Sequence, residues 1–175
     1  LKPWNIEELE ELEEESGNKV YTVLQLRVHP SLIELRRKLL AEKRSDKHEV
    51  ILTYITSRGR WYLVSWKGQQ ERSGGLATNI GIHFFDMLIW LFGAVQHSEV
   101  HLADQTSTGG FIELERARVR WFLSIDPEDL PPAATEKGLR TYRSITIDGE
   151  EVEFSGGFTD LHTVVYKDIL EGGGF

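Results

Sequence analysis

The chain has 175 residues, of which 40% are hydrophobic and 27% are charged. This length and apolar content predict one globular domain, residues 1–175, and exclude a disordered chain. A formal net charge of −8 argues against nucleic acid or an anionic membrane as the main partner. No cysteine is present, which excludes disulfides and thiolate-ligated metals and is compatible with a cytoplasmic location.

The N-terminal part of the chain predicts a helix followed by a strand. Asn5 and Glu8 have the spacing of a capping box, and Gly17 suits the position after the last helical turn. Residues 20–28 then alternate and are rich in β-branched side chains, which predicts a strand. One face of that strand would carry Tyr21, Val23, Gln25, Arg27 and His29.

The middle of the chain alternates between helix and strand patterns. Ser31 is expected to cap a second helix that runs to about Lys43. Residues 49–56 and 61–66 read as strands joined by a turn. After a loop at 68–75, residues 78–92 predict a long helix that is apolar almost all the way round, and such a helix is normally buried.

The remainder of the chain is richer in strands. Asp148-Gly149 is a strong signal for a two-residue hairpin. The predicted strands are 98–103, 111–119, 120–125, 141–147 and 151–154, and the final predicted helix is 160–170. These patterns predict an α+β fold with an open, largely antiparallel β-sheet and helices packed on one face.

Three polar side chains interrupt the long apolar helix. Asn79, His83 and Asp86 are spaced i, i+4 and i+7, which places them on one helix face. An imidazole has a suitable pKa for a general base, so His83 is a catalytic candidate. Asn79 could hold a substrate hydroxyl or orient the ring, and Asp86 could bind a hydroxyl or fix the imidazole. The alternative is that all three groups serve neighbouring loops.

A metal site is not expected, because His83 and Asp86 lack a third ligand close to them in the sequence.

Two other segments could bind a ligand. Arg58, Arg60 and Lys67 alternate with aromatic residues, which suits a phosphate beside a base or sugar ring, or else an ordinary edge hairpin. Gln25 and Arg27 could contact a substrate, although a polar strand face is more often the solvent face.

The start of the last helix carries two further polar residues. Asp160 is more typical of a helix N-cap than of a catalyst. His162, two residues later, is a substrate-binding candidate.

The glycine pair before the long helix and the pattern Asn79-x3-His83-x2-Asp86 resemble the substrate domain of the glucose-fructose oxidoreductase and inositol dehydrogenase family. The subgroup that it is most similar to is the bacterial UDP-N-acetylglucosaminuronate 3-dehydrogenases. The family usually has aspartate where this chain has Asn79, so one carboxylate of the usual trio is missing. The similar segments are 23–30, 60–68, 73–83, 113–117 and 157–163.

The resemblance implies a two-domain parent protein that oxidises a nucleotide sugar with NAD. The family's N-terminal Rossmann domain, its Glu-Lys-Pro motif and a C-terminal tail are not found in this chain, which contains no Gly-x-Gly-x-x-Gly. The cofactor would therefore be bound mainly by the upstream domain. The chain alone is expected to be inactive.

The resemblance also implies roles for individual residues. His83 would take the proton of the sugar 3-hydroxyl, with Asn79 and Asp86 holding neighbouring hydroxyls or the imidazole. Arg58, Arg60 and Lys67 would bind the uronate or the diphosphate. The open sheet face would form a dimer or tetramer. The alternatives are another sugar or polyol dehydrogenase of the same family, or a non-catalytic module that associates through its sheet.

Overall fold

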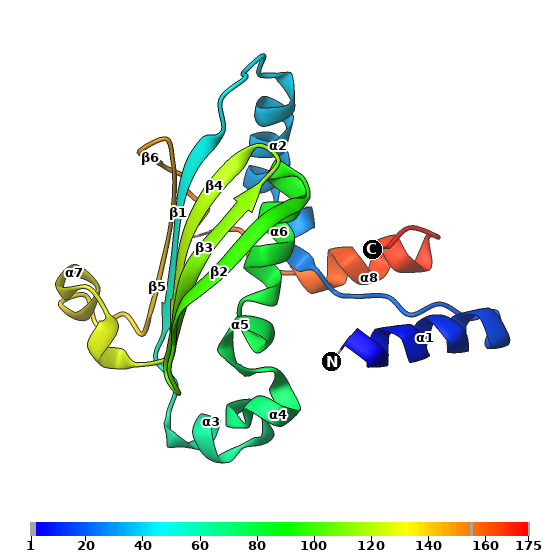
Figure 1. Ribbon diagram of the computed structural model, residues 1–175, viewed down its shortest axis with the longest axis horizontal. Helices are drawn as coiled ribbons and strands as arrows, with labels where there is room; N and C mark the ends of the chain where they lie inside the picture. Colours follow the sequence, from blue (N-terminus) through cyan, green and yellow to red (C-terminus); the bar gives the residue numbers. More distant parts are fainter. Residues whose placement is uncertain (1–2, 155, 175) are drawn as a thin grey trace.

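The computed structural model describes residues 3–154 and 156–174. Its longer helices lie on the same side of one β-sheet, and the N-terminal helix is the farthest from it (Figure 1). The helices are α1 (Pro3–Ser16), α2 (Pro30–Ala41), α3 (Arg60–Val64), α4 (Gln70–Ser73), α5 (Gly75–Asn79), α6 (Ile82–Phe92), α7 (Pro132–Thr135) and α8 (Leu161–Leu170), with 3-10 turns η1 (Gln25–Val28), η2 (Trp66–Gly68) and η3 (Pro127–Asp129). The strands are β1 (His48–Thr56), β2 (Val95–Ala103), β3 (Ser107–Leu114), β4 (Ala117–Ser124), β5 (Thr141–Ile147) and β6 (Glu150–Glu151).

The sheet has six strands in the order β2-β3-β4-β1-β5-β6. The pairing of β1 with β4 is parallel, and the other four pairings are antiparallel. Helices α2 and α6 cover one face of this sheet, while the short α7 lies on its other side (Figure 1). The prediction of an α+β fold with an open, largely antiparallel sheet is confirmed.

The core lies between the sheet and the two helices that cover it. The alternation of β1 buries Val50 and Leu52, whereas Ile51 between them is 45% exposed on the other face. The fully buried residues of α6 meet this inner face, and each large apolar side chain contributes about 1.5–3 kcal/mol when it is removed from water. The buried residues of α6 are Phe84, Met87, Leu88, Leu91 and Phe92.

The predicted helix 78–92 is confirmed as helical but is broken into α5 and α6. The backbone N–H groups of Ile80 and Gly81 both donate to the Leu76 carbonyl, which interrupts the regular pattern. Gly81 is buried here, and a Cβ at this position would lie 2.3 Å from the Ala77 carbonyl and 2.9 Å from Leu123. The close packing of the glycine against β4 therefore sets where the helix bends.

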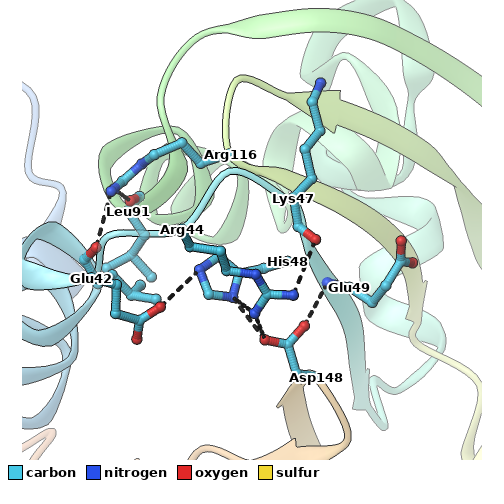
Figure 2. Close-up of polar contacts among 9 residues, drawn as sticks. Glu42, Arg44, Lys47, His48, Glu49, Leu91, Arg116 and Asp148 are labelled. Carbon is cyan, nitrogen blue, oxygen red and sulfur yellow. Dashed lines mark hydrogen bonds and ion pairs between the residues drawn. The ribbon is translucent and has the colours of Figure 1, made fainter.

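The C-terminal end of α6 is held by a dense polar network (Figure 2). The Arg116 guanidinium donates to the Leu91 and Leu39 carbonyls, which are unpaired helix-end acceptors. The His48 ring packs against Phe92 at 5.7 Å. Its Nδ1 lies 2.8 Å from Asp148, and its Nε2 lies 3.3 Å from Glu42. Every polar atom of this imidazole therefore has a protein partner.

The same network fixes the hairpin between β5 and β6. Asp148 and Gly149 both have positive φ, at 53° and 87°, as a type I′ turn requires. The Asp148 carboxylate accepts hydrogen bonds from the Glu49 N–H and from Arg44. The predicted hairpin is confirmed, although its second strand covers only Glu150–Glu151 rather than 151–154.

The predicted strand at 20–28 is wrong. Residues 25–28 form the 3-10 turn η1, in which the Arg27 N–H donates to Leu24 and the His29 N–H to Leu26. Strand β1 is paired with β4 on one side and with β5 on the other. Residues 20–28 therefore could not pair with β1 as an additional strand. His29 is also only 2% exposed, so the expectation of a shared strand face does not hold.

The predicted strand at 61–66 is wrong as well. The segment forms α3 and η2, with the Ser65 N–H bonded to the Trp61 carbonyl. Tyr62 is 3% exposed and packs with Leu76 and Ile125 in a small second core, while Val64 is 80% exposed. The apolar and aromatic residues of this segment, which the sequence suggested were a strand, thus belong to a short helix that buries Tyr62.

Several element ends also differ from prediction. Helix α1 begins at Pro3, so Asn5 lies inside it, and α2 begins at Pro30, so Ser31 does not cap it. The strands predicted at 111–119 and 120–125 are instead β3 and β4, with a turn at Glu115-Arg116. Strands 49–56 and 141–147 and the last helix are confirmed, and Gly17 has the positive φ expected at a helix end.

In the part of the chain that the structure describes, no single helix is long and apolar enough to cross a membrane. The segments Gln70–Asn79 and Ile82–Phe92 reach that length and hydropathy only together, with a bend of 46° between them.

Candidate functional site

The N-terminal end of α6 presents His83 in a half-buried position. Burial is the largest influence on the pKa of His83 and lowers it. The charge of His162 lowers this pKa further, whereas the charge of Asp86 raises it. Nδ1 is sealed from solvent without a hydrogen-bond partner, whereas Nε2 is not sealed. The ring is therefore neutral at pH 7 and has one nitrogen open to a ligand.

Asp86 lies one turn after His83 and is paired with Arg27. The Arg27 Nε donates to Oδ2 at 2.9 Å, and Nη2 donates to Oδ1, so the pair is bidentate. Arg27 is 26% exposed and Asp86 is 11% exposed, which shields the pair from water. Two residues that the sequence separates by 59 positions are thus brought together, and the carboxylate orients Arg27 rather than the His83 ring.

Asn79 ends α5, on the other side of the helix break from His83. Its Nδ2 donates to the Tyr62 hydroxyl at 2.7 Å. Together with Ile82 and Thr78, it lines a largely apolar cavity of about 710 Å³ between α1 and α5. The side-chain oxygen of Asn79 remains available to accept a hydrogen bond, because the Nδ2 group makes the contact with Tyr62.

Unpartnered buried polar atoms occur on α6 and on the turn η1 that packs against it. Five buried side-chain polar atoms of the described residues have no hydrogen-bond partner: Gln25 Oε1, His29 Nδ1, His83 Nδ1, Trp121 Nε1 and Arg143 Nε. Gln25 lies in η1, which packs against α6 and α8. A buried polar group without a partner costs about 1–3 kcal/mol, so such a concentration is typical of a site that completes its bonds with a ligand.

Arg143 is a residue of this region that sequence reasoning missed. It lies on β5 opposite Tyr54, on the face that packs toward the helices. Its guanidinium carbon is 4.2 Å from the Phe158 ring centroid and 5.4 Å from those of Tyr54 and Phe154. The sequence held one indication of its role: in the alternating strand 141–147, position 143 places a charged side chain on the apolar face.

The three predicted phosphate-binding residues lie together at the α3 end of the molecule. Arg58 and Arg60 are exposed, and Lys67 Nζ lies 6.0 Å and 5.9 Å from the ring centroids of Trp61 and Trp66. The predicted interleaving of basic and aromatic side chains is therefore present, on a helix and a turn rather than on a strand. Helix α5 lies between these residues and His83, because η2 contacts α5 and α5 contacts α6.

The start of α8 brings His162 near the site. His162 is exposed, and its charge acts on the His83 ring. Asp160 occupies the N-cap position with a φ of 64°, but its side chain makes no capping hydrogen bond. Among the residues that the structure describes, no group of three metal-ligating side chains is present.

Residues 48–129 match the family described as "Oxidoreductase family, C-terminal alpha/beta domain". The WlbA (WbpB) dehydrogenase of Thermus thermophilus, solved with NAD and alpha-ketoglutarate, is 60% identical with a TM-score of 0.93. Solved with NAD and UDP-GlcNAcA, it is 59% identical with a TM-score of 0.92. The chain belongs to this oxidoreductase family. These matches cover 100% of the chain and 56% of the Thermus protein.

More distant members of the oxidoreductase family share the fold. The WlbA dehydrogenase of Bordetella pertussis, solved with NADH and UDP-GlcNAcA, is 18% identical with a TM-score of 0.70, over 91% of this chain and 54% of that one. A likeness at this identity shows the fold alone. It agrees with the open-sheet α+β fold expected from the sequence.

Proposed function

We propose that this chain is the substrate-binding C-terminal domain of an NAD-dependent dehydrogenase that oxidises the 3-hydroxyl of a UDP-N-acetylglucosaminuronate-like sugar. The observation that carries the proposal is His83, a neutral half-buried imidazole with one open nitrogen. It stands in a chain 59% identical, over its whole length, to a dehydrogenase solved with NAD and UDP-GlcNAcA. The reaction would serve the synthesis of bacterial surface polysaccharide.

His83 would accept the proton of the sugar 3-hydroxyl at Nε2. Burial lowers the pKa of the ring, so at neutral pH the nitrogen is free to accept it. NAD, when bound, supplies the hydride acceptor. The chain has no Gly-x-Gly-x-x-Gly loop, so an upstream domain would hold most of the dinucleotide and contribute the family's lysine.

The other site residues would hold the sugar in place. The Asn79 oxygen is available for a hydroxyl because the Tyr62 hydroxyl fixes its amide. Asp86 would act mainly through Arg27, whose guanidinium it orients. Gln25 has an unpartnered buried oxygen and His162 lies close to His83, so both are candidates for sugar contacts. Arg58, Arg60 and Lys67 would contact the uronate or the diphosphate.

We infer that copies of the protein associate through the open face of the sheet. This face carries exposed apolar residues such as Ile51 beside charged ones such as Arg118 and Glu49, which form an ion pair at 3.5 Å. An exposed flat sheet of this kind normally needs cover. The net charge of −8 makes a nucleic acid or an anionic membrane surface a poor partner, and a cytoplasmic location fits the sugar substrate.

A substrate panel on the full-length protein tests the proposal. NADH formation is expected with UDP-N-acetylglucosaminuronate, and much less with UDP-glucose or inositol. A preference for inositol would favour the alternative of a polyol dehydrogenase. No turnover with any sugar would favour a non-catalytic association module. The 175-residue chain alone is expected to form no NADH, because the dinucleotide site and the lysine would lie elsewhere.

A further inference from the structure

Arg143 is a half-buried cation to which the described part of the chain offers no counter-ion. None of the ion pairs among residues 3–154 and 156–174 includes it. The rings of Tyr54, Phe154 and Phe158 surround it at 4.2–5.4 Å from its guanidinium carbon. Aromatic faces attract a cation but do not neutralise its charge, and the one hydrogen-bond partner of the guanidinium among the described residues is the Tyr54 hydroxyl, a neutral group.

The surroundings of Arg143 are unfavourable for an unpaired charge. Burial lowers the pKa of Arg143, and the Tyr54 hydroxyl opposes this only in part. Nε is buried without a hydrogen-bond partner, whereas the rest of the guanidinium has the Tyr54 hydroxyl within hydrogen-bond reach. The two terminal nitrogens carry four N–H groups, so a single bond to Tyr54 leaves donors for an incoming acceptor.

Arg143 and His83 belong to the same region of the molecule. The Tyr54 ring beside Arg143 also packs on Phe84, the neighbour of His83, at 4.8 Å between centroids. On the other side, Phe158 precedes α8, whose His162 acts on His83. Contacts from β1 and from the segment before α8 thus connect the guanidinium to the proposed base.

Other cations near the site are less suited to bind an anion. Arg27 already gives its planar Nε–Nη2 edge to Asp86. Arg58 and Arg60 are exposed, so water competes for their charges. A guanidinium whose hydration is replaced by aromatic rings binds a carboxylate more strongly than an exposed one does.

We propose that Arg143 binds the carboxylate of the sugar acid through its terminal N–H groups and so selects a uronate over a neutral sugar. The inference rests on the proposed function and adds the residue that decides its substrate class. The planar fork of arginine matches the two oxygens of a carboxylate, which a lysine ammonium does not. A neutral sugar has no carboxylate to pair with Arg143. It would bury the guanidinium further without an anion, and it would therefore bind less well than the uronate.

The test is the binding of UDP-N-acetylglucosaminuronate and neutral UDP-N-acetylglucosamine to the full-length protein, measured by calorimetry. Arg143→Met is expected to raise Kd for the uronate roughly 10- to 100-fold and to leave Kd for the neutral sugar within about twofold. Arg143→Lys keeps the charge without the fork, and is expected to raise the uronate Kd roughly 3- to 10-fold. Arg140→Met removes an exposed arginine close by and is the matched control.

Three results separate the possibilities. Unchanged preference for the uronate in Arg143→Met, or an equal loss for both sugars, overturns the role of Arg143 and leaves the proposed function standing. Failure of the unaltered protein to bind either UDP-sugar overturns the proposed function, and this inference with it. Should Arg143→Met not fold, an Arg143→Lys variant with the same uronate affinity as the unaltered protein overturns the inference.

Discussion

The two ends of α6 place histidines in opposite surroundings. At the C-terminal end, His48 is 6% exposed, and both ring nitrogens face carboxylates. At the N-terminal end, His83 is half-buried, and its Nδ1 has no partner. Two imidazoles that meet the same helix therefore differ in whether the protein itself satisfies them.

The difference separates a structural polar cluster from a candidate site. The groups around His48 bond to one another and to helix-end carbonyls, so the imidazole is satisfied by the protein (Figure 2). Near His83, the buried atoms of Gln25 and Arg143 also lack partners. Because folding selects against unpartnered buried groups, their retention at one end of α6 is the basis of the proposal that this end binds the substrate.

Removal of the His83 ring is expected to have the largest effect on activity. His83→Ala in the full-length protein should lower kcat roughly 10²- to 10⁴-fold, because the proton acceptor is lost. The free energy of unfolding should change little, since the ring has no hydrogen-bond partner for Nδ1. NADH formation and urea denaturation measure the two quantities, and an unchanged rate would return His83 to a structural role.

The pH profile of the full-length protein sharpens the same point. Burial lowers the pKa of His83, so the ring stays neutral to a lower pH than an exposed histidine. The acidic limb of kcat/KM should therefore lie below pH 6.5, and it should disappear from the residual activity of His83→Ala. A limb above pH 6.5 would contradict the assignment.

Disruption of the Arg27–Asp86 pair is expected to affect both stability and binding. Asp86→Asn leaves a shielded guanidinium without its anion, which should lower the free energy of unfolding by about 2 kcal/mol. It should also weaken UDP-sugar binding about tenfold, since Arg27 loses its orientation. Glu34→Gln removes the exposed pair with Arg37 and is the matched control, with an expected change below about 0.5 kcal/mol. Equal effects of the two variants would show that burial of the pair is unimportant.

His48 should behave in the opposite way to His83. His48→Ala breaks the contacts to Asp148 and Glu42 and removes packing on Phe92, which should cost about 2 kcal/mol of stability. Turnover below the new melting temperature should remain that of the unaltered protein. A loss of turnover similar to that of His83→Ala would remove the distinction between the two ends of α6.

The smallest expected effect is the acid sensitivity of the hairpin network. Burial tends to raise the pKa of Asp148, but the Glu49 N–H, His48 and Arg44 outweigh it and lower the pKa from 3.8 to about 2. A depressed carboxyl pKa stabilises the fold above pH 3.8, and this stability is lost as the pH falls toward 2. After allowance for solvent screening, the contribution is about 1 kcal/mol.

Acid unfolding of Asp148→Asn measures this contribution. The variant should be less stable than the unaltered protein at pH 6, and the difference should shrink on acidification to pH 2. A difference that is constant between these two pH values would show that the carboxylate charge is not responsible.

Local patterns predicted the elements that carry their own signals. The alternation of 49–56, the Asp148-Gly149 turn and the apolar run of α6 were all interpreted correctly. Residues 20–28 and 61–66 alternate too, yet neither is a strand. A strand also needs a neighbour to pair with, and the sequence pattern contains no information about which sheet edges remain free.

The candidate site also combines a part that a local sequence pattern predicts and a part that only the tertiary structure shows. The spacing of Asn79, His83 and Asp86 pointed to a functional face because it is written in one continuous segment. The partners of that face are distant in sequence: Arg27 lies 59 residues from Asp86, and Tyr62 lies 17 residues from Asn79. The Arg143 cage draws on β1, β5 and the segment before α8, so no local pattern could reveal it.

The sequence by itself therefore determined the fold class and the family resemblance, and it made His83 a candidate, since each depends on residue types at short spacing. Tertiary structure decided which histidine is satisfied by the protein and which is left open. It also decided which arginine already has its anion and which does not. Those distinctions depend on burial and on contacts between remote segments, and burial is what makes an unpartnered charge or imidazole costly enough to indicate a ligand.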